Sequence, residues 1–533
     1  MWTLSFIAFL TILSCGAVEP VKVFLFAGQS NMEGADTRPE DVSKYPPYRD
    51  VFPPLENVRY SYQTGARYKS DGWTTLQAVG NIFGPEVTFA RRFRERSKAP
   101  LAIIKDAWGG TTLINDWAPD GGDEKSKKLY QRFLIHIRAR LADLKKLGVP
   151  YQVEALIWHQ GENDMFHRKG KLQYGENLKN FIASLRKDLK IPDLKVFIGE
   201  ISTKGVWGMD NRANVALIRR GQIAVVESDP RIVFVPTSHL SFKVGRPFGL
   251  HYHFGTLGQL QHGEEYARAY LGKPQVKLKP VQIPKGKKVK LFVLGGQRNM
   301  EGEEAWLAEL ADTNLTGTQG ALFQFNLGKV TRSEQWQLLG PIDYLGNFGP
   351  ELTFGRKIIP TMKNNEVAAI FKFTDSGSQS LDWLPEGSKE PYRDRYQSWI
   401  SEIKRVRDGL IKQGNQCEIQ AVFWHCGEND RALNWMADKY ANRFETFMKA
   451  SRRDLELPTL PFFLSEQPMI PESIRGDKKL YDLNSDLVAL AGKDPNLTFI
   501  ETSDLPRGPV LFGTKGVMAL GERMAERWIE SHH

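Results

Sequence analysis

Two segments of the chain are almost identical, and they differ at the one position where a nucleophile would stand. Residues 23–34 contain the run Gly-Gln-Ser-Asn-Met-Glu-Gly, and residues 291–302 contain Gly-Gln-Arg-Asn-Met-Glu-Gly. The hydroxyl of Ser30 becomes a nucleophile when a neighbouring base removes its proton. The guanidinium of Arg298, at the matching position, stays protonated and has no lone pair with which to attack. The pair predicts one domain with a working serine and one that has kept the shape without the chemistry.

The duplication extends along the whole chain at a nearly constant offset. The matched positions are Ser30 with Arg298, Gly84 with Gly349, residues 158–164 (Trp-His-Gln-Gly-Glu-Asn-Asp) with 424–430, and residues 254–258 with 512–516. Units this long are whole domains rather than the short repeats of a solenoid. With 533 residues, the chain is also too long for a single hydrophobic core.

Short apolar runs alternate with amphipathic stretches in each copy. In the first copy, the runs that are typical of strands are residues 21–27, 101–105, 153–158, 195–198 and 232–235. Apolar residues recur at helical spacing from Leu129 to Leu144, and again from Tyr396 to Leu410 in the second copy. This alternation predicts an α/β fold, with a parallel sheet of about five strands and helices on both faces in each domain. Residues 28–30 and 161–163, which follow strands, are then expected at the sheet edge where ligands bind.

The first 17 residues have the features of a secretory signal peptide. An apolar run from Leu4 to Leu13 is followed by Ser-Cys-Gly-Ala, small residues that suit cleavage after Ala17. The run is too short to span a bilayer. A lipid anchor on Cys15 is the less favoured alternative. We therefore expect a secreted or periplasmic protein without a transmembrane segment.

A stretch rich in lysine and proline separates the two copies. Between Lys273 and Lys290 the chain has seven Lys, three Pro and no acidic residue, which predicts a solvated linker. Much of the formal net charge of +10 is local to this stretch, and no nucleic-acid-binding motif accompanies it, so nucleic acid is not an expected partner. The expected boundaries are a signal peptide at 1–17, a first domain at 18–272, a linker at 273–288 and a second domain at 289–533.

Apart from Cys15, the chain has two cysteines, Cys417 and Cys426. They lie at the two ends of the apolar run 419–424, which is typical of one strand. A strand of about nine residues, at roughly 3.3 Å each, holds its ends too far apart for a disulfide bond. Both cysteines are predicted to be free.

Taken together, the Gly-Gln-Ser-Asn-Met, Phe-Gly-Pro-Glu and Trp-His-Gln-Gly-Glu-Asn-Asp blocks resemble the SGNH hydrolase superfamily. Within it they are most similar to the sialate O-acetylesterase and acetyl xylan esterase branch, carbohydrate esterase family six. The similarity covers residues 21–271, and a weaker version covers residues 289–530. The resemblance implies two tandem SGNH domains of the flavodoxin-like, three-layer kind. It also implies a serine hydrolase that removes acetyl groups from a carbohydrate without a cofactor.

The resemblance assigns roles to individual residues. Ser30 is the nucleophile that carries the acetyl group, and His253 is the general base. The backbone amides of Ser30 and Gly84, with the side-chain amide of Asn163, form the oxyanion hole. The residues expected to support the site are Gln29, Asn31, Gln160, Glu162 and His251. Three plainer interpretations stay open: a helix cap for Ser30, a turn residue for Asn163 and a structural imidazole for His253.

The acid that would orient the base is missing from its usual place. The family's last block has an Asp three residues before the catalytic His, and here that position holds Leu250. Taking His251 as the base puts Phe248 at the position instead. Either His253 acts without an acid and at a lower rate, or an acid from elsewhere in the chain reaches it. The weak candidates for such an acid are Glu86, Asp164 and Glu200.

His251 and His253 also raise the question of a metal site. Two histidines one residue apart need a third ligand, and no nearby Cys, Asp or further His completes a recognisable set. No metal is expected.

The second copy lacks both reacting groups. Arg298 replaces the nucleophile and Leu511 replaces the base, while Gly349 and Asn429 persist at the oxyanion positions. Cys426 is a nucleophile by type, but it does not align with Ser30 and is expected to be a small buried residue. The second domain is therefore expected to be structural or substrate-binding, with the charge of Arg298 turned toward an anionic sugar.

The sequence thus predicts a secreted carbohydrate O-acetylesterase whose N-terminal domain does the chemistry. The alternative is a catalytically dead carbohydrate-binding protein, and the apolar residue at position 250 is its main argument. A thioesterase or lipase on the same fold is disfavoured by the carbohydrate-esterase blocks and the export signal.

Overall fold

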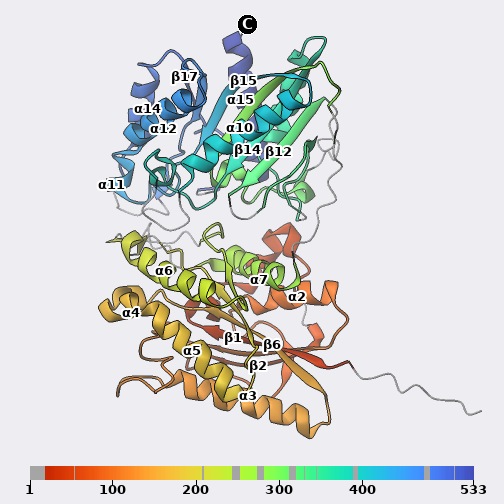
Figure 1. Ribbon diagram of the computed structural model, residues 1–533, viewed down its shortest axis with the longest axis vertical. Helices are drawn as coiled ribbons and strands as arrows, with labels where there is room; N and C mark the ends of the chain where they lie inside the picture. The colour runs from red at the N-terminus through yellow and green to blue at the C-terminus, as the bar shows by residue number, and fades with distance from the viewer. Residues whose placement is uncertain are drawn as a thin grey trace, which may run out of the picture.

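The computed structural model of the chain contains two α/β domains, one above the other in Figure 1. The described residues are 19–52, 55–203, 205–206, 209–242, 253–272, 281, 283–310, 320–328, 331–343, 345–387, 394–472, 480–508 and 510–532. The predicted signal peptide, Leu250 and His251 lie outside them. The expectation of two tandem α/β domains with mostly parallel sheets is confirmed.

The N-terminal sheet has β1 near its centre. Its strand order is β10-β7-β6-β1-β5-β2-β3, with β4 also paired to β2, and the pairs from β10 to β2 are parallel. The strands are β1 (Val21–Gly28), β2 (Leu55–Thr64), β3 (Tyr68–Lys69), β4 (Thr74–Leu76), β5 (Leu101–Ala107), β6 (Tyr151–His159), β7 (Lys195–Gly199) and β10 (Ile232–Val235). A separate hairpin pairs β8 (Gly205–Val206) with β9 (Met209–Asp210).

Helices cover both faces of this sheet, because successive residues of a strand point to opposite sides. The helices are α1 (Ser30–Glu33), α2 (Glu86–Arg96), α3 (Leu129–Lys146), α4 (Arg168–Leu172), α5 (Tyr174–Leu189), α6 (Arg212–Ser228) and α7 (Gly255–Leu271). Val23 and Leu25 of β1 are buried in one core with α3, α5 and α6. Phe24 and Phe26 are buried in the other core with α2 and α7. The resulting three layers hold the end of β1 rigidly at the middle of the sheet edge.

The C-terminal domain repeats this plan. Its sheet has the order β13-β12-β14-β11-β15-β16-β17, with an antiparallel β12–β13 pair and parallel pairs elsewhere in its described strands. The strands are β11 (Lys288–Gly296), β12 (Ala321–Leu327), β13 (Gln337–Leu338), β14 (Glu366–Thr374), β15 (Gln416–His425), β16 (Phe462–Ser465) and β17 (Leu497–Ile500). The helices are α8 (Arg298–Glu301), α9 (Glu351–Ile358), α10 (Tyr396–Lys412), α11 (Asn434–Ala437), α12 (Tyr440–Asp454), α14 (Leu483–Ala491) and α15 (Gly513–His532). No helix in the described part of the chain is long and apolar enough to cross a membrane.

The end of the first strand lies where the strand order reverses. β1 is flanked by β5 and β6; on the β5 side the chain runs from β1 to β2 and back to β5, and on the other side it runs outward from β6 to β7 and β10. In open parallel sheets, the crevice beyond the carboxyl ends of the strands at such a point holds the ligand. Ser30 follows β1 and Asn163 follows β6, so both lie at this crevice.

The sequence analysis does not predict one parallel strand in each domain, β2 and β12. In β2, the buried residues Val58 and Tyr60 alternate with Arg59, and the strand pairs with the short edge strands β3 and β4. A strand near the edge of a sheet keeps polar residues in its pattern, so it does not read as a continuous apolar run.

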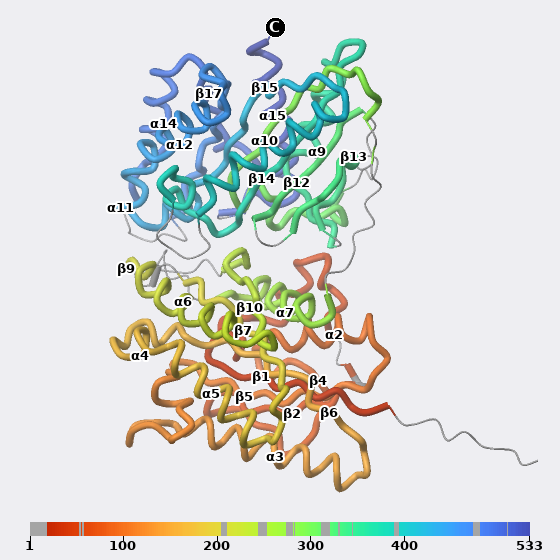
Figure 2. Tube along the Cα trace, viewed as in Figure 1, coloured from red at the N-terminus to blue at the C-terminus, as the bar shows by residue number. Residues whose placement is uncertain are grey.

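The two domains share an apolar contact. Trp306 of the C-terminal domain is 4% exposed and belongs to one cluster with Tyr48 and Leu257 of the N-terminal domain. Its ring lies edge-on to Tyr45, with 6.0 Å between the ring centroids. Figure 2 shows α7 on the side of the N-terminal domain that faces the C-terminal domain. The end of the N-terminal domain that holds the crevice is therefore covered in part by the second copy.

Two apolar residues of the predicted linker are packed, while residues 284–286 are exposed. Val281 and Ile283 lie against the C-terminal core, and the backbone N–H of Val281 donates to the carbonyl oxygen of Trp336 at 2.9 Å. The lysines that surround these two residues in the sequence make the segment look solvated, while its apolar residues anchor it to the second domain.

Both remaining cysteines are free, as predicted. Burial raises the pKa of the Cys417 thiol to about 12 and that of Cys426 well above its ordinary value. A thiol with so high a pKa is not a nucleophile at neutral pH.

Candidate active site

Ser30 follows directly on β1 and begins α1. Gly28, the last residue of β1, has a φ of +154°, and a Cβ there would lie 2.0 Å from the carbonyl oxygen of His159. The glycine therefore allows β1 and β6 to end side by side. Ser30 is partly exposed, and within the described residues neither its Oγ nor its backbone N–H makes a hydrogen bond. Both groups are open to an incoming substrate.

Ser30 and His253 lie at the same end of the sheet, and a hydrogen bond joins the residues next to them in the chain. Asn31 Oδ1, next to Ser30, accepts a hydrogen bond of 3.2 Å from the backbone N–H of Phe254, next to His253. Burial raises the pKa of the Glu33 carboxyl, and the hydrogen bond from the backbone N–H of Gly109 offsets part of this rise. Ser30 Oγ and His253 are not themselves hydrogen-bonded, a separation that is common before a substrate is bound.

A carboxylate from the nucleophile's own block reaches the imidazole. His253 Nδ1 lies 2.9 Å from Asp36 Oδ2. Asp36 stands six residues after Ser30 and has a left-handed φ of +65°, which is uncommon for a residue with a side chain. The sequence analysis did not name Asp36. The signal that would have found it is the matching position in the second copy, where Glu304 is also acidic.

The three acids considered from the sequence have other partners. Glu86 is paired with Lys105 at 2.8 Å, and Glu200 with Arg219 at 3.0 Å. Asp164 accepts hydrogen bonds from two backbone amides of the loop after β5, and burial raises its pKa to about 6. These acids stabilise the strands and loops around the crevice. Among the described residues, no three His, Cys, Asp or Glu side chains are grouped so that they could hold a metal ion.

The backbone N–H of Gly84 already has a partner. It donates to Glu86 Oε1 at 3.2 Å, and a Cβ on Gly84 would lie 2.5 Å from the carbonyl oxygen of Met32. This glycine therefore serves close packing at the start of α2. Gly110, in the loop after β5, has a backbone N–H without a partner in the described chain, and a Cβ there would lie 3.8 Å from Asn163 Nδ2. Gly110 is better placed than Gly84 to donate to a developing oxyanion.

Gln29 holds the loop that carries Asn163. Gln29 Oε1 accepts hydrogen bonds from Gln160 Nε2 and Gly161 N, both at 3.2 Å, and from Asn163 N at 3.4 Å. Gln29 Nε2 donates to Asn163 Oδ1 at 3.4 Å. The amide oxygen of Asn163 is thereby turned toward Gln29, and its Nδ2 has no partner within the described residues. The side chain therefore has an open donor beside Gly110.

Glu162 and Asn31 link the segment around Ser30 to the buried His159 by hydrogen bonds. Glu162 Oε1 accepts a hydrogen bond from Asn31 Nδ2 at 2.6 Å and lies 3.2 Å from His159 Nε2. Burial alone would raise the pKa of Glu162, but the charge of His159 and these hydrogen bonds bring it below its ordinary value. The ionised carboxylate holds Asn31, which in turn holds the His253 loop through Phe254. Of the five residues expected to support the site, four lie in this network or around Gln29, and His251 is outside the described residues.

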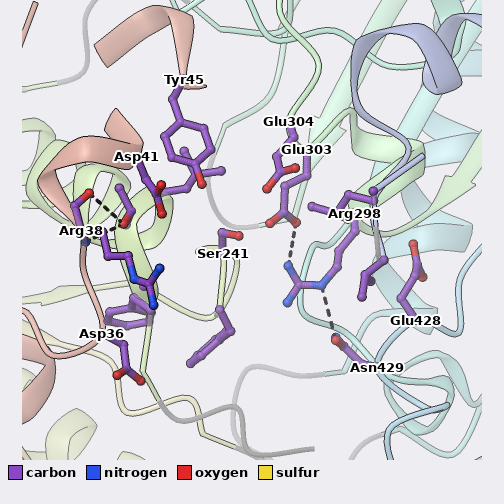
Figure 3. Close-up of a pocket in the computed structure, with 18 of the residues that line it drawn as sticks. Asp36, Arg38, Asp41, Tyr45, Ser241, Arg298, Glu303, Glu304, Glu428 and Asn429 are labelled. Carbon is purple, nitrogen blue, oxygen red and sulfur yellow. Dashed lines mark hydrogen bonds and ion pairs between the residues drawn. The ribbon is translucent and has the colours of Figure 1, made fainter. Parts of the chain in front are cut away.

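Arg298 is held in the second copy by its own neighbours. Its Nη1 lies 2.6 Å from Glu303 Oε2, and its Nε donates to Asn429 Oδ1 at 3.3 Å (Figure 3). This pairing compensates its charge and does not support the expectation that Arg298 binds an anionic sugar. Gly349, like its counterpart in the first copy, donates its N–H to a glutamate at 2.8 Å. Leu511 is buried at the position of His253.

The oxyanion donors of the second copy are all occupied. The backbone N–H of Arg298 donates to Ser376 Oγ at 3.1 Å, where the first copy has a glycine. The backbone N–H of Gly377 donates to Gln297 Oε1 at 3.2 Å, and Asn429 Nδ2 donates to the same oxygen at 2.9 Å. At the positions that match Ser30 and His253, the second copy therefore has Arg298 and Leu511, and the matching donors have internal partners.

Comparison with known proteins matches both halves of the chain to one family. The model of the family described as carbohydrate esterase, sialic acid-specific acetylesterase matches residues 20–272 and again residues 288–530. A probable carbohydrate esterase of Arabidopsis thaliana is 26% identical over 267 residues, which make up 48% of this chain and 92% of that protein. An X-ray structure of an Arabidopsis thaliana protein matches at 24% identity with a TM-score of 0.36 and covers 47% of this chain and 98% of its own. A carbohydrate acetylesterase from Xanthomonas citri matches at 19% identity with a TM-score of 0.34, over 50% of this chain and 60% of its own. Since two tandem matches span most of the chain, the protein belongs to the carbohydrate esterase, sialic acid-specific acetylesterase family.

Proposed function

We propose that the protein is a serine carbohydrate O-acetylesterase that acts through its N-terminal domain. The observation that carries the proposal is the 2.9 Å contact between His253 Nδ1 and Asp36 Oδ2, at the sheet edge where Ser30 follows β1. In serine hydrolases, an imidazole held by a carboxylate on Nδ1 acts as the base through its Nε2. Family membership supports an acetylated carbohydrate as the substrate.

In the proposed reaction, His253 Nε2 takes the proton of Ser30 Oγ while Oγ attacks the acetyl carbonyl carbon. Three donors, the backbone N–H groups of Ser30 and Gly110 and Nδ2 of Asn163, stabilise the negative charge on the carbonyl oxygen. His253 then gives its proton to the sugar oxygen, which leaves as a hydroxyl, and an acetyl-Ser30 ester remains. A water molecule deprotonated by the same imidazole attacks this ester, releases acetate and restores the serine. Asp36 stabilises the imidazolium in both steps.

The proposed role of the C-terminal domain is non-catalytic. Arg298 and Leu511 stand at the positions of the nucleophile and the base, and the oxyanion donors have internal partners. Restoring a single group would not restore this second site.

The alternative of a dead carbohydrate-binding protein loses its main support. That alternative rested on Leu250, which leaves the usual acid position without a carboxylate. Asp36 provides a carboxylate to His253 from another part of the domain. The pairing of Nδ1 with an acid favours an imidazole that works as a base over one that is merely structural.

The proposed location and partner of the enzyme are supported by the apolar run near residue 10 and by the lysine-rich stretch between the domains. We propose that residues 1–17 direct export, that the catalytic domain spans 18–272, and that the second domain spans 289–533 after a linker at 273–288. The proposed partner is an acetylated carbohydrate rather than nucleic acid. Export supports a substrate outside the cytoplasm, such as a polysaccharide or a glycan.

The test compares Ser30→Ala with the wild type in the hydrolysis of p-nitrophenyl acetate and in labelling by a fluorophosphonate probe. Ser30→Ala is expected to lower kcat/KM by about 10³-fold or more and to abolish labelling. Ser43→Ala, an exposed serine in the same domain, is the matched control and should leave both readouts unchanged. Hydrolysis at the wild-type rate by Ser30→Ala would overturn the proposal.

A further inference from the structure

A cavity of about 380 Å³ lies between the two domains (Figure 3). The N-terminal domain contributes Asp36, Tyr45 and Phe254 to its wall, and the C-terminal domain contributes Glu303 and Glu304, among others. Asp36 holds His253, and Phe254 follows His253 in the chain, so the cavity adjoins the proposed catalytic groups. Its volume falls within the range of small-molecule binding sites.

The C-terminal side of this cavity is built from the remains of the second active site. Glu304 occupies the position that corresponds to Asp36, and the two residues have nearly the same left-handed φ, +62° and +65°. Figure 3 shows their carboxyl groups on opposite sides of the cavity. Arg298, at the position of Ser30, and Asn429, at the position of Asn163, line the same wall. The sheet edge that carries Arg298 in the second domain thus faces the proposed active site of the first domain.

The cavity wall is acidic. Among the residues that line it, five carry carboxyl groups (Asp36, Asp41, Glu303, Glu304 and Glu428), and two carry guanidinium groups (Arg38 and Arg298). Burial would raise the pKa of Glu428, but the charge of His425 brings it to about 2, so this group is an anion at neutral pH. A second negative charge placed in this cavity would be repelled.

One buried carboxylate oxygen in this wall has no internal donor. Glu303 is 7% exposed, and its Oε2 is paired with Arg298. Its Oε1 has no hydrogen-bond partner within the described residues. A buried acceptor without a donor costs free energy, and a hydroxyl from a ligand would remove that cost. Glu304 is a further acceptor or donor in the same wall, since burial and the neighbouring Glu303 raise its pKa to about 7.

Aromatic rings complete the cavity on the N-terminal side. Phe254 packs against Phe242 with 5.1 Å between the ring centroids, and Tyr45 lies further along the wall. A pocket with aromatic rings on one side and hydrogen-bonding groups on the other suits a ring with one apolar face and several hydroxyls. Such a ligand is a sugar residue.

We propose that this cavity is a carbohydrate subsite built by both domains, in which Glu303 and Glu304 of the C-terminal domain accept hydrogen bonds from the hydroxyls of an uncharged sugar residue. The acidic wall selects against a sugar that carries a carboxylate. The subsite rests on the proposed function, because it holds a part of the acetylated substrate next to the proposed triad. The second domain then contributes to substrate choice although it performs no chemistry.

The kinetic test uses two substrates that differ by one negative charge and one methyl group, 9-O-acetyl-N-acetylneuraminic acid and its methyl ester, with p-nitrophenyl acetate as a substrate without a sugar. The wild-type full chain is expected to prefer the methyl ester by about tenfold or more in kcat/KM. Glu304→Gln and Glu303→Gln should each narrow this preference by about threefold or more, because each makes the wall of the cavity less negative, the second by leaving the charge of Arg298 without its partner. Glu418→Gln, an exposed glutamate of β15, is the control and should leave the preference unchanged.

A second measurement does not depend on hydrolysis. In a calorimetric titration of the Ser30→Ala chain, xylotriose is expected to bind, N-acetylneuraminic acid to bind at least about tenfold more weakly, and Glu304→Gln to weaken xylotriose binding. Equal rates on the two sialate substrates would overturn the subsite, and so would a preference that neither glutamate variant changes. In either case, Ser30-dependent hydrolysis of p-nitrophenyl acetate would leave the esterase proposal intact. Absence of that hydrolysis would instead overturn the esterase proposal, and the titration would then decide on the subsite alone. Glu304→Gln serves where Glu303→Gln, which leaves Arg298 unpaired, fails to fold.

Discussion

Asp36 and His253 stand 217 residues apart in the chain, and Asp36 Oδ2 lies 2.9 Å from His253 Nδ1. The acid therefore comes with the nucleophile, six residues after Ser30, and not with the base. The block that begins at Gly28 contains the proposed nucleophile, the proposed acid and Asn31, whose Oδ1 accepts a hydrogen bond from the backbone next to the proposed base. Only the imidazole itself must be brought from the far end of the domain.

Replacing Asp36 by Asn should slow the chemical step. The uncharged amide would no longer stabilise an imidazolium at His253, so we expect kcat for p-nitrophenyl acetate to fall by about 10²-fold with little change in KM. This loss is smaller than for a buried triad acid, because the Asp36 side chain is 45% exposed and water can replace part of its effect.

Steady-state kinetics from pH 5 to 9 measure this effect. Glu40→Gln, an exposed acid four residues on, is the control and should behave as the wild type. An unchanged kcat for Asp36→Asn would mean that the 2.9 Å contact is structural and that the base works unaided.

Removing the side-chain amide of Asn163 should weaken the oxyanion hole. Asn163→Ala is expected to lower kcat by about 10²–10³-fold, the usual cost of one oxyanion donor. Its Oδ1 accepts one weak hydrogen bond from Gln29 at 3.4 Å, so the melting temperature should change little. Rates and thermal melts of Asn163→Ala, compared with the exposed Asn442→Ala on α12, separate a catalytic loss from unfolding. A large fall in melting temperature with kcat preserved would argue against the donor role.

Returning a serine to the second copy should not return activity. In a Ser30→Ala background, Arg298→Ser is expected to give no hydrolysis of p-nitrophenyl acetate above that background. Ser376 Oγ occupies the backbone N–H at position 298, and Leu511 offers no base. Stopped assays at high enzyme concentration are the measurement. Activity above about 1% of the wild type would show that the second oxyanion hole opens more readily than its hydrogen bonds imply.

The stability of the chain should depend on pH through Glu304. Burial first, and then the negative charge of Glu303, raise its pKa to about 7, above the ordinary value of 4.5. The folded state therefore binds this proton more tightly than the unfolded state, and the free energy of unfolding falls as pH rises from about 4.5 to 7. Glu304→Gln removes this fall, so relative to the wild type it should gain about 2 kcal/mol between pH 5 and pH 8.

Thermal unfolding of both proteins at the two pH values checks the sign. Glu418→Gln should follow the wild type at both pH values, since it is exposed. A variant that gains stability at pH 5 rather than at pH 8 would contradict the raised pKa of Glu304.

The sequence predicts the fold well and points to Ser30 as the proposed nucleophile, because both predictions depend on local patterns. Buried parallel strands such as β1 and β6 read as apolar runs, and the block around Ser30 recurs at Arg298. The two-domain α/β fold is confirmed, and Gln29, Asn31, Gln160 and Glu162 do converge by hydrogen bonds near Ser30 and Asn163.

The proposed acid, Asp36, and one proposed oxyanion donor, Gly110, are not predicted from the sequence, because their positions depend on how loops fold back on the sheet. Asp36 lies in no recognisable motif, and the contact with His253 needs a left-handed turn that the sequence does not announce. Gly84 and Gly110 are both glycines near loops, and the sequence does not distinguish them. The structure does, because the N–H of Gly84 donates to Glu86 Oε1 and is therefore not available to a substrate. The comparison of Asp36 with Glu304 across the repeat is the one sequence signal that would have pointed to the acid.

Because Trp306 is buried among residues of the N-terminal domain, we expect the two domains to unfold together. If the domains came apart, the indole would lose its apolar partners Tyr48 and Leu257, and both surfaces would turn to water. The duplicated halves should therefore melt as one cooperative unit instead of as two independent transitions. A truncated first half would expose the apolar residues Tyr48 and Leu257 to water, which is expected to lower its solubility.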